Sequence, residues 1–242
     1  MIKLLIQVIL LTLPCILNGQ SLEVIYKCKN KGNIQTEIKN TENEKIKQAL
    51  IAAKDIISNY FINFKLSQKG QYSYFAESED GNDPLTSSED GKISYTLSAR
   101  NDIIYKDYNL SQFVAKKHQV SRAYHVEDQF MNFDWQISKE QRKILGFDCI
   151  KATSTYCGKE IVAWFTLAIP IQNGPMELGG LPGLILEATN GTGLIYTAQS
   201  VRMNVEIENL PYLSSHKKAI THNEFCEEVR KKKGLKIDMN DN

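Results

Sequence analysis

The chain has 242 residues, of which 42% are hydrophobic and 24% are charged, and its formal net charge at pH 7 is +1. These values are typical of a globular protein that can bury a core. The longest basic tract is the four residues at 230–233. Because nucleic-acid binding needs a clustered positive face, the sequence argues against nucleic acid as the main partner.

Residues 1–20 predict a secretory signal peptide. Lys3 supplies a short positively charged start, and residues 4–13 are almost entirely apolar. That run is shorter than the roughly 20 residues that a membrane-spanning helix needs, and no later segment is longer. We therefore expect residues 21–242 to form a single exported β-rich domain, periplasmic or extracellular, without a transmembrane segment.

Short segments of alternating polar and apolar residues, bounded by turn residues, dominate the rest of the chain. The expected strands are 21–29, 60–67, 72–77, 92–99, 103–108, 114–126, 130–137, 144–156, 161–169, 184–189 and 194–203. This pattern predicts a mainly β fold, with some helix, built on an antiparallel and meandering sheet that is curved or folded into a sandwich.

Two segments have helical spacing instead. Thr41 and Glu44 make a capping-box pattern at the start of residues 42–58, where apolar residues recur every three or four positions. Thr221 and Glu224 repeat that pattern near the end of the chain. We expect an inserted amphipathic helix and a C-terminal helix, both covering a face or an edge of the sheet.

Four cysteines follow the expected signal peptide, namely Cys28, Cys149, Cys157 and Cys226. An exported protein can pair them, and three pairing schemes are possible. Direct pairing of Cys149 with Cys157 is disfavoured, because eight residues of continuous strand span roughly 26 Å. These two cysteines should pair elsewhere or stay free.

A series of short motifs runs through residues 134–187. They are Asp-Trp-Gln-Ile at 134–137, Ile-Leu-Gly-Phe-Asp-Cys at 144–149, Lys-Ala-Thr at 151–153, Ala-Trp-Phe-Thr at 163–166 and Gly-Gly-Leu-Pro-Gly-Leu-Ile-Leu-Glu at 179–187. Their order and spacing resemble the GLPGLI family of secreted Bacteroidota proteins. The resemblance implies export and a mostly β fold, and it brings no catalytic residues because that family has no established activity. Cys157 departs from the family, which commonly has an arginine there.

The last of these motifs is the candidate structural signature of the chain. It consists of Gly179, Gly180, Leu181, Pro182, Gly183, Leu184, Ile185, Leu186 and Glu187. Pro182 followed by Gly183 predicts a type II turn in which Gly183 has a positive φ. A role as a corner that fixes strand register is favoured over anion binding, because no Lys-Ser/Thr ending and no helix follow the glycines.

Candidate chemistry elsewhere is sparse. His118 with His125, and His216 with His222, lack the spacing of a metal site, and the second pair is expected on the surface. No Gly-x-Ser-x-Gly or His-Glu-x-x-His pattern occurs. Of the aromatic residues at strand spacing, most should be core and a few can line a ligand cleft; they are Tyr72, Tyr74, Phe75, Trp135, Trp164 and Phe165.

These features favour an exported binding or accessory protein of the cell envelope over an enzyme. The expected partner is an envelope protein or a small apolar ligand, and no cofactor is expected. Two alternatives stay open. One is an envelope hydrolase whose residues meet only in three dimensions. The other is a protein that binds or carries metal through His118, His125 and the cysteines.

Overall fold

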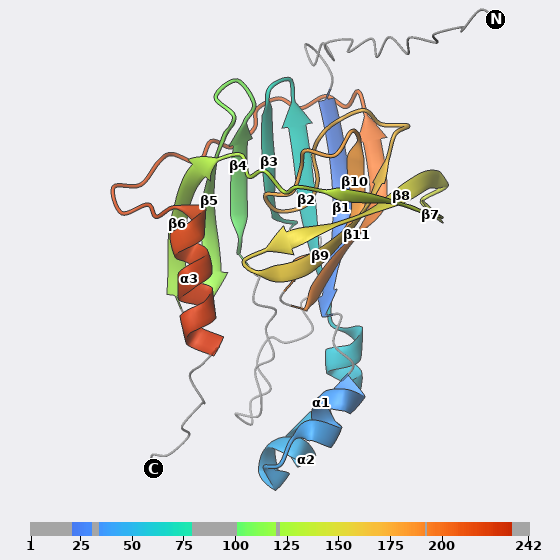
Figure 1. Cartoon of the computed structure of the whole chain (residues 1–242), viewed down its shortest axis with the longest axis vertical. Coiled ribbons are helices and arrows are strands. Elements are labelled where there is room, and N and C mark those ends of the chain that lie inside the picture. Colours follow the sequence, from blue (N-terminus) through green and yellow to red (C-terminus); the bar gives the residue numbers. More distant parts are fainter. Residues whose placement is uncertain (1–20, 31–33, 79–100, 120–121, 192, 234–242) are drawn as a thin grey trace, which may run out of the picture.

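The fold is built on one curved antiparallel sheet (Figure 1). The computed structural model describes residues 21–30, 34–78, 101–119, 122–191 and 193–233. Within them the strands are β1 (Ser21–Asn30), β2 (Ile62–Lys69), β3 (Tyr72–Glu77), β4 (Ile103–Asp107), β5 (Gln112–Gln119), β6 (Arg122–Gln129), β7 (Gln136–Ile144), β8 (Phe147–Tyr156), β9 (Lys159–Thr166), β10 (Leu184–Thr189) and β11 (Leu194–Met203). The prediction of a mainly β, antiparallel and meandering fold is confirmed.

The sheet consists of two meandering arms that meet at its centre. Its strand order is β6-β5-β4-β3-β2-β1-β11-β10-β9-β8-β7. The first arm therefore runs outward from β1 to the edge strand β6, and the second runs from the edge strand β7 inward to β11. Pairing of β1 with β11 joins the first and last strands of the sheet, from Leu22 opposite Met203 to Asn30 opposite Leu194.

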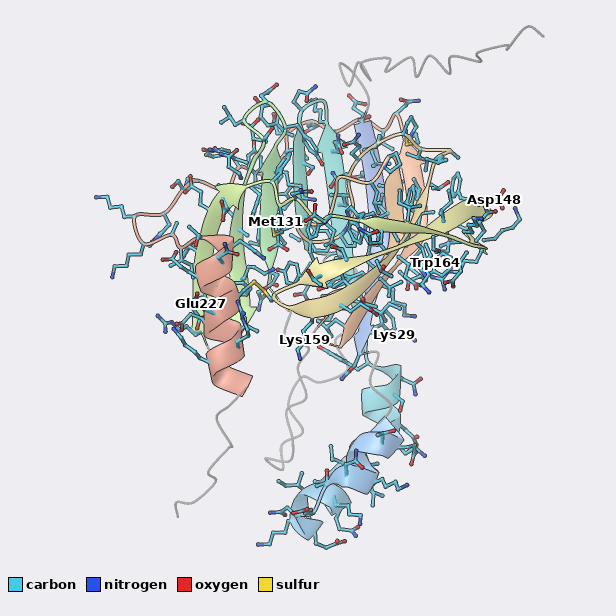
Figure 2. The ribbon with its side chains drawn as sticks, viewed as in Figure 1. Lys29, Met131, Asp148, Lys159, Trp164 and Glu227 are labelled. Atoms are coloured by element: carbon cyan, nitrogen blue, oxygen red, sulfur yellow. A yellow bond between two sulfur atoms is a disulfide. The ribbon has the colours of Figure 1, made fainter. Side chains whose placement is uncertain are left out.

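The two arms enclose the core. In Figure 1, β7, β8 and β9 cross over the face of the first arm, and Figure 2 shows side chains filling the space between the arms. Phe64 of β2 stacks on Phe75 of β3 with ring centroids 5.0 Å apart, and Tyr196 of β11 packs edge-on against both rings. The alternation of β1 buries every second side chain from Leu22 to Cys28, as half-buried strands require.

The stretch between β9 and β10, residues 167–183, is here called the inner segment because much of it lies within the core. Ile171, Leu178 and Leu181 are almost fully buried. Buried backbone groups need hydrogen-bond partners, and Asn173 supplies two of them through a bridge to Gly179 and through its carbonyl, which accepts from the Ile185 amide at 3.0 Å. The inner segment thus fills the space inside the curved sheet while its backbone groups keep hydrogen-bond partners.

The C-terminal helix α3 (His222–Lys233) confirms the predicted capping box. The Thr221 amide donates to Glu224 Oε2 at 2.7 Å, and the Glu224 amide donates back to Thr221 Oγ1 at 3.3 Å. Phe225 is buried and packs its ring edge-on against Tyr124 of β6. α3 therefore covers the β6 edge of the sheet, as predicted.

The inserted helix α2 (Glu44–Asn59) forms, but the prediction that it covers the sheet is wrong. It packs against the short helix α1 (Ile34–Asn40) and projects away from the sheet (Figure 1). The residue that caps the start of α2 is Asn43 and not the predicted Thr41. The Asn43 side chain accepts a hydrogen bond from the Ile46 amide at 3.2 Å. The helices leave and return at the same end of the sheet, because β1 and β2 are antiparallel neighbours there.

None of the described helices is long and apolar enough to cross a membrane.

Three predicted strands differ most from the observed ones. Residues 114–126 form two paired strands, β5 and β6, in which Gln119 lies opposite Arg122; the reversal between them carries no glycine or proline signal. Residues 144–156 also hold a reversal, since Leu145 and Gly146 take positive φ values of 52° and 83° between β7 and β8. The predicted strand at 130–137 begins only at Gln136, and the one at 92–99 lies outside the described residues.

Three other pairs of consecutive strands form hairpins where turn residues separate them. β2 and β3 meet at Gly70, and β8 and β9 meet at Cys157 and Gly158. The strands of the last hairpin, Leu184–Thr189 and Leu194–Met203, have the predicted bounds. Glycines at these reversals carry positive φ, which explains why the sequence marks them clearly.

The predicted type II turn at Pro182 and Gly183 is wrong. Positive φ falls on Gly180, at 77°, and not on Gly183. Gly183 is required for another reason: a Cβ added there would lie 2.0 Å from the carbonyl oxygen of Thr166. The glycine lets the inner segment pass directly against the end of β9.

Replacing Gly183 with alanine should destabilise the fold by more than about 2 kcal/mol, because backbone must move to admit the methyl group. Gly180→Ala is the matched control, since open space surrounds its Cβ position and only the positive φ is strained. It should cost about 1 kcal/mol. Denaturant unfolding of both variants measures the difference, and an equal loss in both would contradict the steric explanation.

Candidate functional site

A buried ion pair links the two arms of the sheet to the inner segment. Lys117 of β5 points into the core, where its Nζ lies 2.6 Å from Glu177 Oε1 of the inner segment. The same Nζ donates to the hydroxyl of Tyr156, at the end of β8, at 2.8 Å. The side chains of Lys117 and Glu177 are only 5% and 0% exposed. This geometry is that of a fully desolvated, hydrogen-bonded pair.

Both members of the pair are held in their charged forms. Burial alone would raise the pKa of Glu177, but the charge of Lys117, with a smaller contribution from His222, lowers it below its usual value. Burial would likewise lower the pKa of Lys117, yet Glu177, Tyr156 and Asp102 raise it. Each charge therefore stabilises the other, and burial raises the pKa of the Tyr156 hydroxyl between them.

A second buried lysine anchors the inner segment to β4. Lys106 Nζ donates to Asn173 Oδ1 and to the Leu178 carbonyl, both at 2.8 Å. The side-chain nitrogen of Asn173, Nδ2, donates in turn to Gln68 Oε1 of β2 at 2.8 Å. Burial lowers the pKa of Lys106 to about 7, and Glu177 only partly offsets this.

Asp102, directly before β4, is a further buried titratable group. Its Oδ1 accepts from the His118 amide at 2.6 Å. Burial raises the pKa of Asp102 to about 7, although Lys117 and this hydrogen bond lower it. These charged groups lie out of reach of solvent-borne ligands, so they position the chain around them and do not bind.

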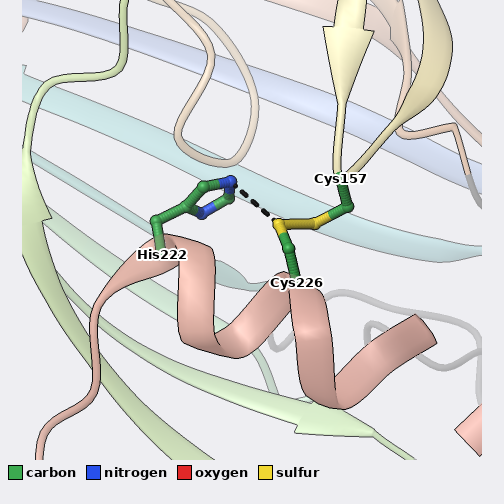
Figure 3. A group of neighbouring side chains, drawn as sticks. All are labelled: Cys157, His222 and Cys226. Carbon is green, nitrogen blue, oxygen red and sulfur yellow. Dashed lines mark hydrogen bonds between the residues drawn. A yellow bond between two sulfur atoms is a disulfide. The ribbon is translucent and has the colours of Figure 1, made fainter. Parts of the chain in front are cut away.

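One hollow of about 400 Å³, here called the disulfide pocket, opens beside α3. Cys157 at the β8–β9 turn is bonded to Cys226 of α3, with a Cα–Cα distance of 4.9 Å. His222 lies one helical turn before Cys226, and its Nε2 is 3.2 Å from Cys226 Sγ (Figure 3). The lining residues are Asp128, Gln129, Phe130, Met131, Asn132, Phe133, Thr155, Tyr156, Cys157, Gly158, His222, Asn223, Cys226 and Arg230.

The structure confirms that Cys149 and Cys157 do not pair with each other. Cys28 and Cys149 are buried free thiols. The disulfide joins the tip of the second arm to the helix that covers the first arm, across 69 residues of sequence. Its two sulfurs, the strongest potential nucleophiles of this pocket, are bonded to each other, which gives the hydrolase alternative no support here.

The β5–β6 hairpin places His118 and His125 on the same face of the sheet as diagonal neighbours, because Lys116 lies opposite His125 and His118 lies opposite Ala123. Their nearest ring and charge partners are other residues. His118 of β5 has its Nδ1 3.6 Å from Asp102 Oδ1, whereas His125 of β6 stacks on His216 with ring centroids 4.1 Å apart. The expectation that His222 lies on the surface is wrong, because it is only 8% exposed. It is buried since α3 turns its first residue toward Tyr156, whose ring lies 5.0 Å away.

A larger hollow of about 670 Å³, here called the aromatic groove, lies at the end of the sheet where β2 turns into β3. Tyr72 and Tyr105 stack along it with ring centroids 6.1 Å apart, and exposed Tyr212 packs edge-on against Tyr105. Its lining residues are Ser21, Lys69, Gly70, Gln71, Tyr72, Tyr105, Asn109, Val205, Glu206, Ile207, Glu208, Asn209 and Leu210.

The aromatic residues singled out from the sequence divide between core and surface. Phe75 and Phe165 are core, and Tyr72, which is 40% exposed, lines the groove. Trp164 lies on the outer side of the second arm, where Arg142 covers its ring at 4.1 Å (Figure 2). Trp135 donates from Nε1 to the carbonyl of Gly179 at 2.9 Å, so it contacts the motif at residues 179–187.

Comparison with known proteins gives a short match and weak similarities. The family described as "Protein of unknown function (Porph_ging)" matches residues 155–187. This region covers the end of β8, the whole of β9, the inner segment and the first four residues of β10. No curated protein matches the chain. The resemblance of the motifs to the GLPGLI family stays a prediction.

Among solved structures, the chain is similar to PNGF-II in two space groups. For the P21 form the TM-score is 0.48 and the identity 15%, over 84% of this chain and 31% of PNGF-II. For the C2 form the TM-score is 0.47 and the identity 14%, over 79% of this chain and 28% of PNGF-II. The chain thus spans less than a third of the length of PNGF-II, and similarity at this level carries no argument about fold or function.

Removing one member of the buried ion pair should cost far more than removing both. Lys117→Met or Glu177→Leu alone leaves an uncompensated buried charge, and each should lower the free energy of unfolding by about 3–5 kcal/mol. The double variant should be clearly more stable than the sum of the single losses predicts. Denaturant unfolding of all four proteins closes the cycle.

The exposed pair of Lys143 and Asp148, with a similar 2.7 Å contact, provides the control. Because water screens that pair, Lys143→Met should change stability little. Additive losses at Lys117 and Glu177 would contradict the coupling that the geometry implies.

The raised pKa of Asp102, about 7, makes stability depend on pH. Between about pH 4 and pH 7 the folded protein holds a proton at Asp102 that the unfolded chain has released. The contribution of Asp102 to the free energy of unfolding should therefore fall as pH rises through this window. Asp102→Asn should gain stability relative to the unmodified protein from pH 4 to pH 8. Parallel pH profiles of the two proteins would contradict this.

Proposed function

We propose that this chain is an exported binding or accessory protein of the cell envelope, with the aromatic groove as its ligand site. The observation that carries the proposal is the composition of the groove, whose lining combines stacked tyrosines and aliphatic side chains with amide and charged side chains. Binding sites for small molecules commonly combine a mainly apolar surface with a few placed polar groups.

The wall of the groove is fixed before any ligand arrives. Lys69 Nζ donates to the carbonyls of Ile207 and Glu208 at 2.6 and 3.0 Å. Ser21 Oγ donates to the Val205 carbonyl at 2.5 Å. These bonds tie the chain after β11 to the ends of β1 and β2. A wall held in place lowers the entropy lost on binding, which supports recognition by a preformed site.

The groove fits a small ligand with one apolar face and polar groups at its edge. Tyr72 offers an exposed ring face, and its hydroxyl accepts a hydrogen bond from Asn109 Nδ2 at 3.3 Å. Ile207 and Leu210 add aliphatic surface, while Glu206 and Glu208 add carboxylates at the rim. Tyrosine suits such a site because its ring is apolar and its hydroxyl is polar.

Two features support export. Residues 1–20 have the pattern of a secretory leader. The Cys157–Cys226 disulfide, which links distant parts of the fold, is the kind of bond that persists in oxidising compartments. Both features favour a periplasmic or extracellular protein.

The binding proposal is tested with chain that carries 3-fluorotyrosine, by ¹⁹F NMR against pools of envelope-derived amphiphiles and peptides. A ligand should shift the Tyr72 and Tyr105 signals together. Tyr72→Ala should weaken binding at least tenfold, since truncating a buried aromatic contact typically costs more than about 1.4 kcal/mol.

Leu167→Ala is the matched surface control, because Leu167 is exposed and lies outside the groove. It should leave the affinity unchanged. A ligand that binds Tyr72→Ala as tightly as the unmodified protein, or that shifts no groove tyrosine, would refute the assignment of this site.

A further inference from the structure

Three side chains that bind soft metal ions converge in the disulfide pocket. They are Cys157 from the β8–β9 turn and His222 and Cys226 from α3, and one potential ligand atom from each lies within 4.8 Å of the others (Figure 3). His222 and Cys226 are four residues apart on a helix, which places both on one face. The fold, and not local sequence, brings Cys157 to them.

The imidazole of His222 is not satisfied by the disulfide. Its Nδ1 is buried without a hydrogen-bond partner among the described residues, and its Nε2 faces Cys226 Sγ at 3.2 Å. A sulfur bonded in a disulfide is a weak partner for an imidazole nitrogen, whereas a thiolate or a shared metal ion is a strong one. The Nε2 atom of His222 is thus placed for a stronger partner than the oxidised Cys226 supplies.

We propose that the reduced form of this pocket is a zinc site, with Cys157, Cys226 and His222 as protein ligands and the disulfide as its closed, metal-free state. Zn²⁺ takes thiolate sulfur at about 2.3 Å and imidazole nitrogen at about 2.0–2.1 Å in tetrahedral geometry. Three ligand atoms within 4.8 Å of one another are close enough to share one such ion. The hollow of about 400 Å³ beside them leaves room for water or another group at the fourth position.

The change from the disulfide form to the zinc-bound form conserves atoms and electrons. A small dithiol gives two electrons and two protons to Cys157 and Cys226, which breaks their bond, and the dithiol leaves as its own disulfide. Zn²⁺ then binds the two thiolates and His222 while two protons pass to solvent. Cys157 is only partly buried and lines the pocket, so a small dithiol can reach it.

Two charged side chains border the proposed zinc site. Asp128 lines the pocket, and its Oδ2 accepts from the His222 amide at 3.0 Å, which holds the first turn of α3 in place. Arg230 also borders the pocket, and its Nε donates to the Cys226 carbonyl at 3.3 Å.

The test uses the full chain without its leader, reduced with dithiothreitol, desalted under nitrogen and titrated with Zn²⁺ against a chromophoric chelator. We expect one tight equivalent per reduced chain and none per oxidised chain. Co²⁺ in place of Zn²⁺ should give thiolate-to-cobalt charge transfer and the strong visible bands of a tetrahedral site. Far-UV circular dichroism should show that the reduced chain stays folded.

Variants separate this site from other thiols. Cys157→Ser and Cys226→Ser should each weaken Zn²⁺ binding at least a hundredfold, and His222→Gln at least tenfold with weaker cobalt bands. Cys149→Ser, at a buried thiol outside the pocket, should bind as the unmodified chain does. Each of three results would overturn the proposal: no stoichiometric binding to the reduced chain, undiminished binding by Cys157→Ser, or loss of the fold on reduction.

Discussion

The buried ion pair between Lys117 and Glu177 is the constraint on which the rest of the structure depends. It joins a strand of the first arm to the inner segment, and Tyr156 brings the end of β8 to the same point. Desolvating two charges costs several kcal/mol for each, so the pair is tolerated only in a geometry that satisfies both partners. That geometry exists only when the second arm crosses the first, and the pair therefore selects the curled form of the sheet over a flat one.

The inner segment explains how so open a strand order encloses a core. An open antiparallel sheet has to bury one face against something, and here residues 167–183 supply much of the filling. Lys106 and Asn173 bind its backbone and side chains to β4 and β2, and Gly183 lets it approach the end of β9. The structural role predicted for the motif at residues 179–187 stays a prediction, but these contacts, with the Trp135 bond to Gly179, favour it.

Features set by residues close together in the sequence could be predicted, and features set by residues far apart could not. The β10–β11 hairpin was predictable to the residue, because glycines mark its turn, β10 is a short apolar run and the first half of β11 alternates. The reversal at Leu145 and Gly146 was missed, because a leucine at positive φ is not expected in a turn, although the glycine beside it was a turn signal. Lys117 follows Phe113 and Ala115 at alternate, inward positions of β5, and this alternation was the only available sign that a charge is buried there. Its partner lies 60 residues away, beyond the reach of any local pattern.

The same limit applies to both hollows. The aromatic groove needs the ends of β1 and β2 and the chain after β11 in one place, and the disulfide pocket needs the β8–β9 turn against α3. One stretch of chain connects the two hollows: residues 205–210 form a wall of the groove, and Ile220 then pairs with β6 through bonds to His125 and Glu127 before α3 begins. The position of α3 therefore sets where this stretch ends, and the Cys157–Cys226 bond fixes α3 to the second arm. A zinc ion held by the same cysteines and His222 would keep that attachment, whereas reduction without metal would leave α3 held by the Ile220 bridge and its packing on β6 alone.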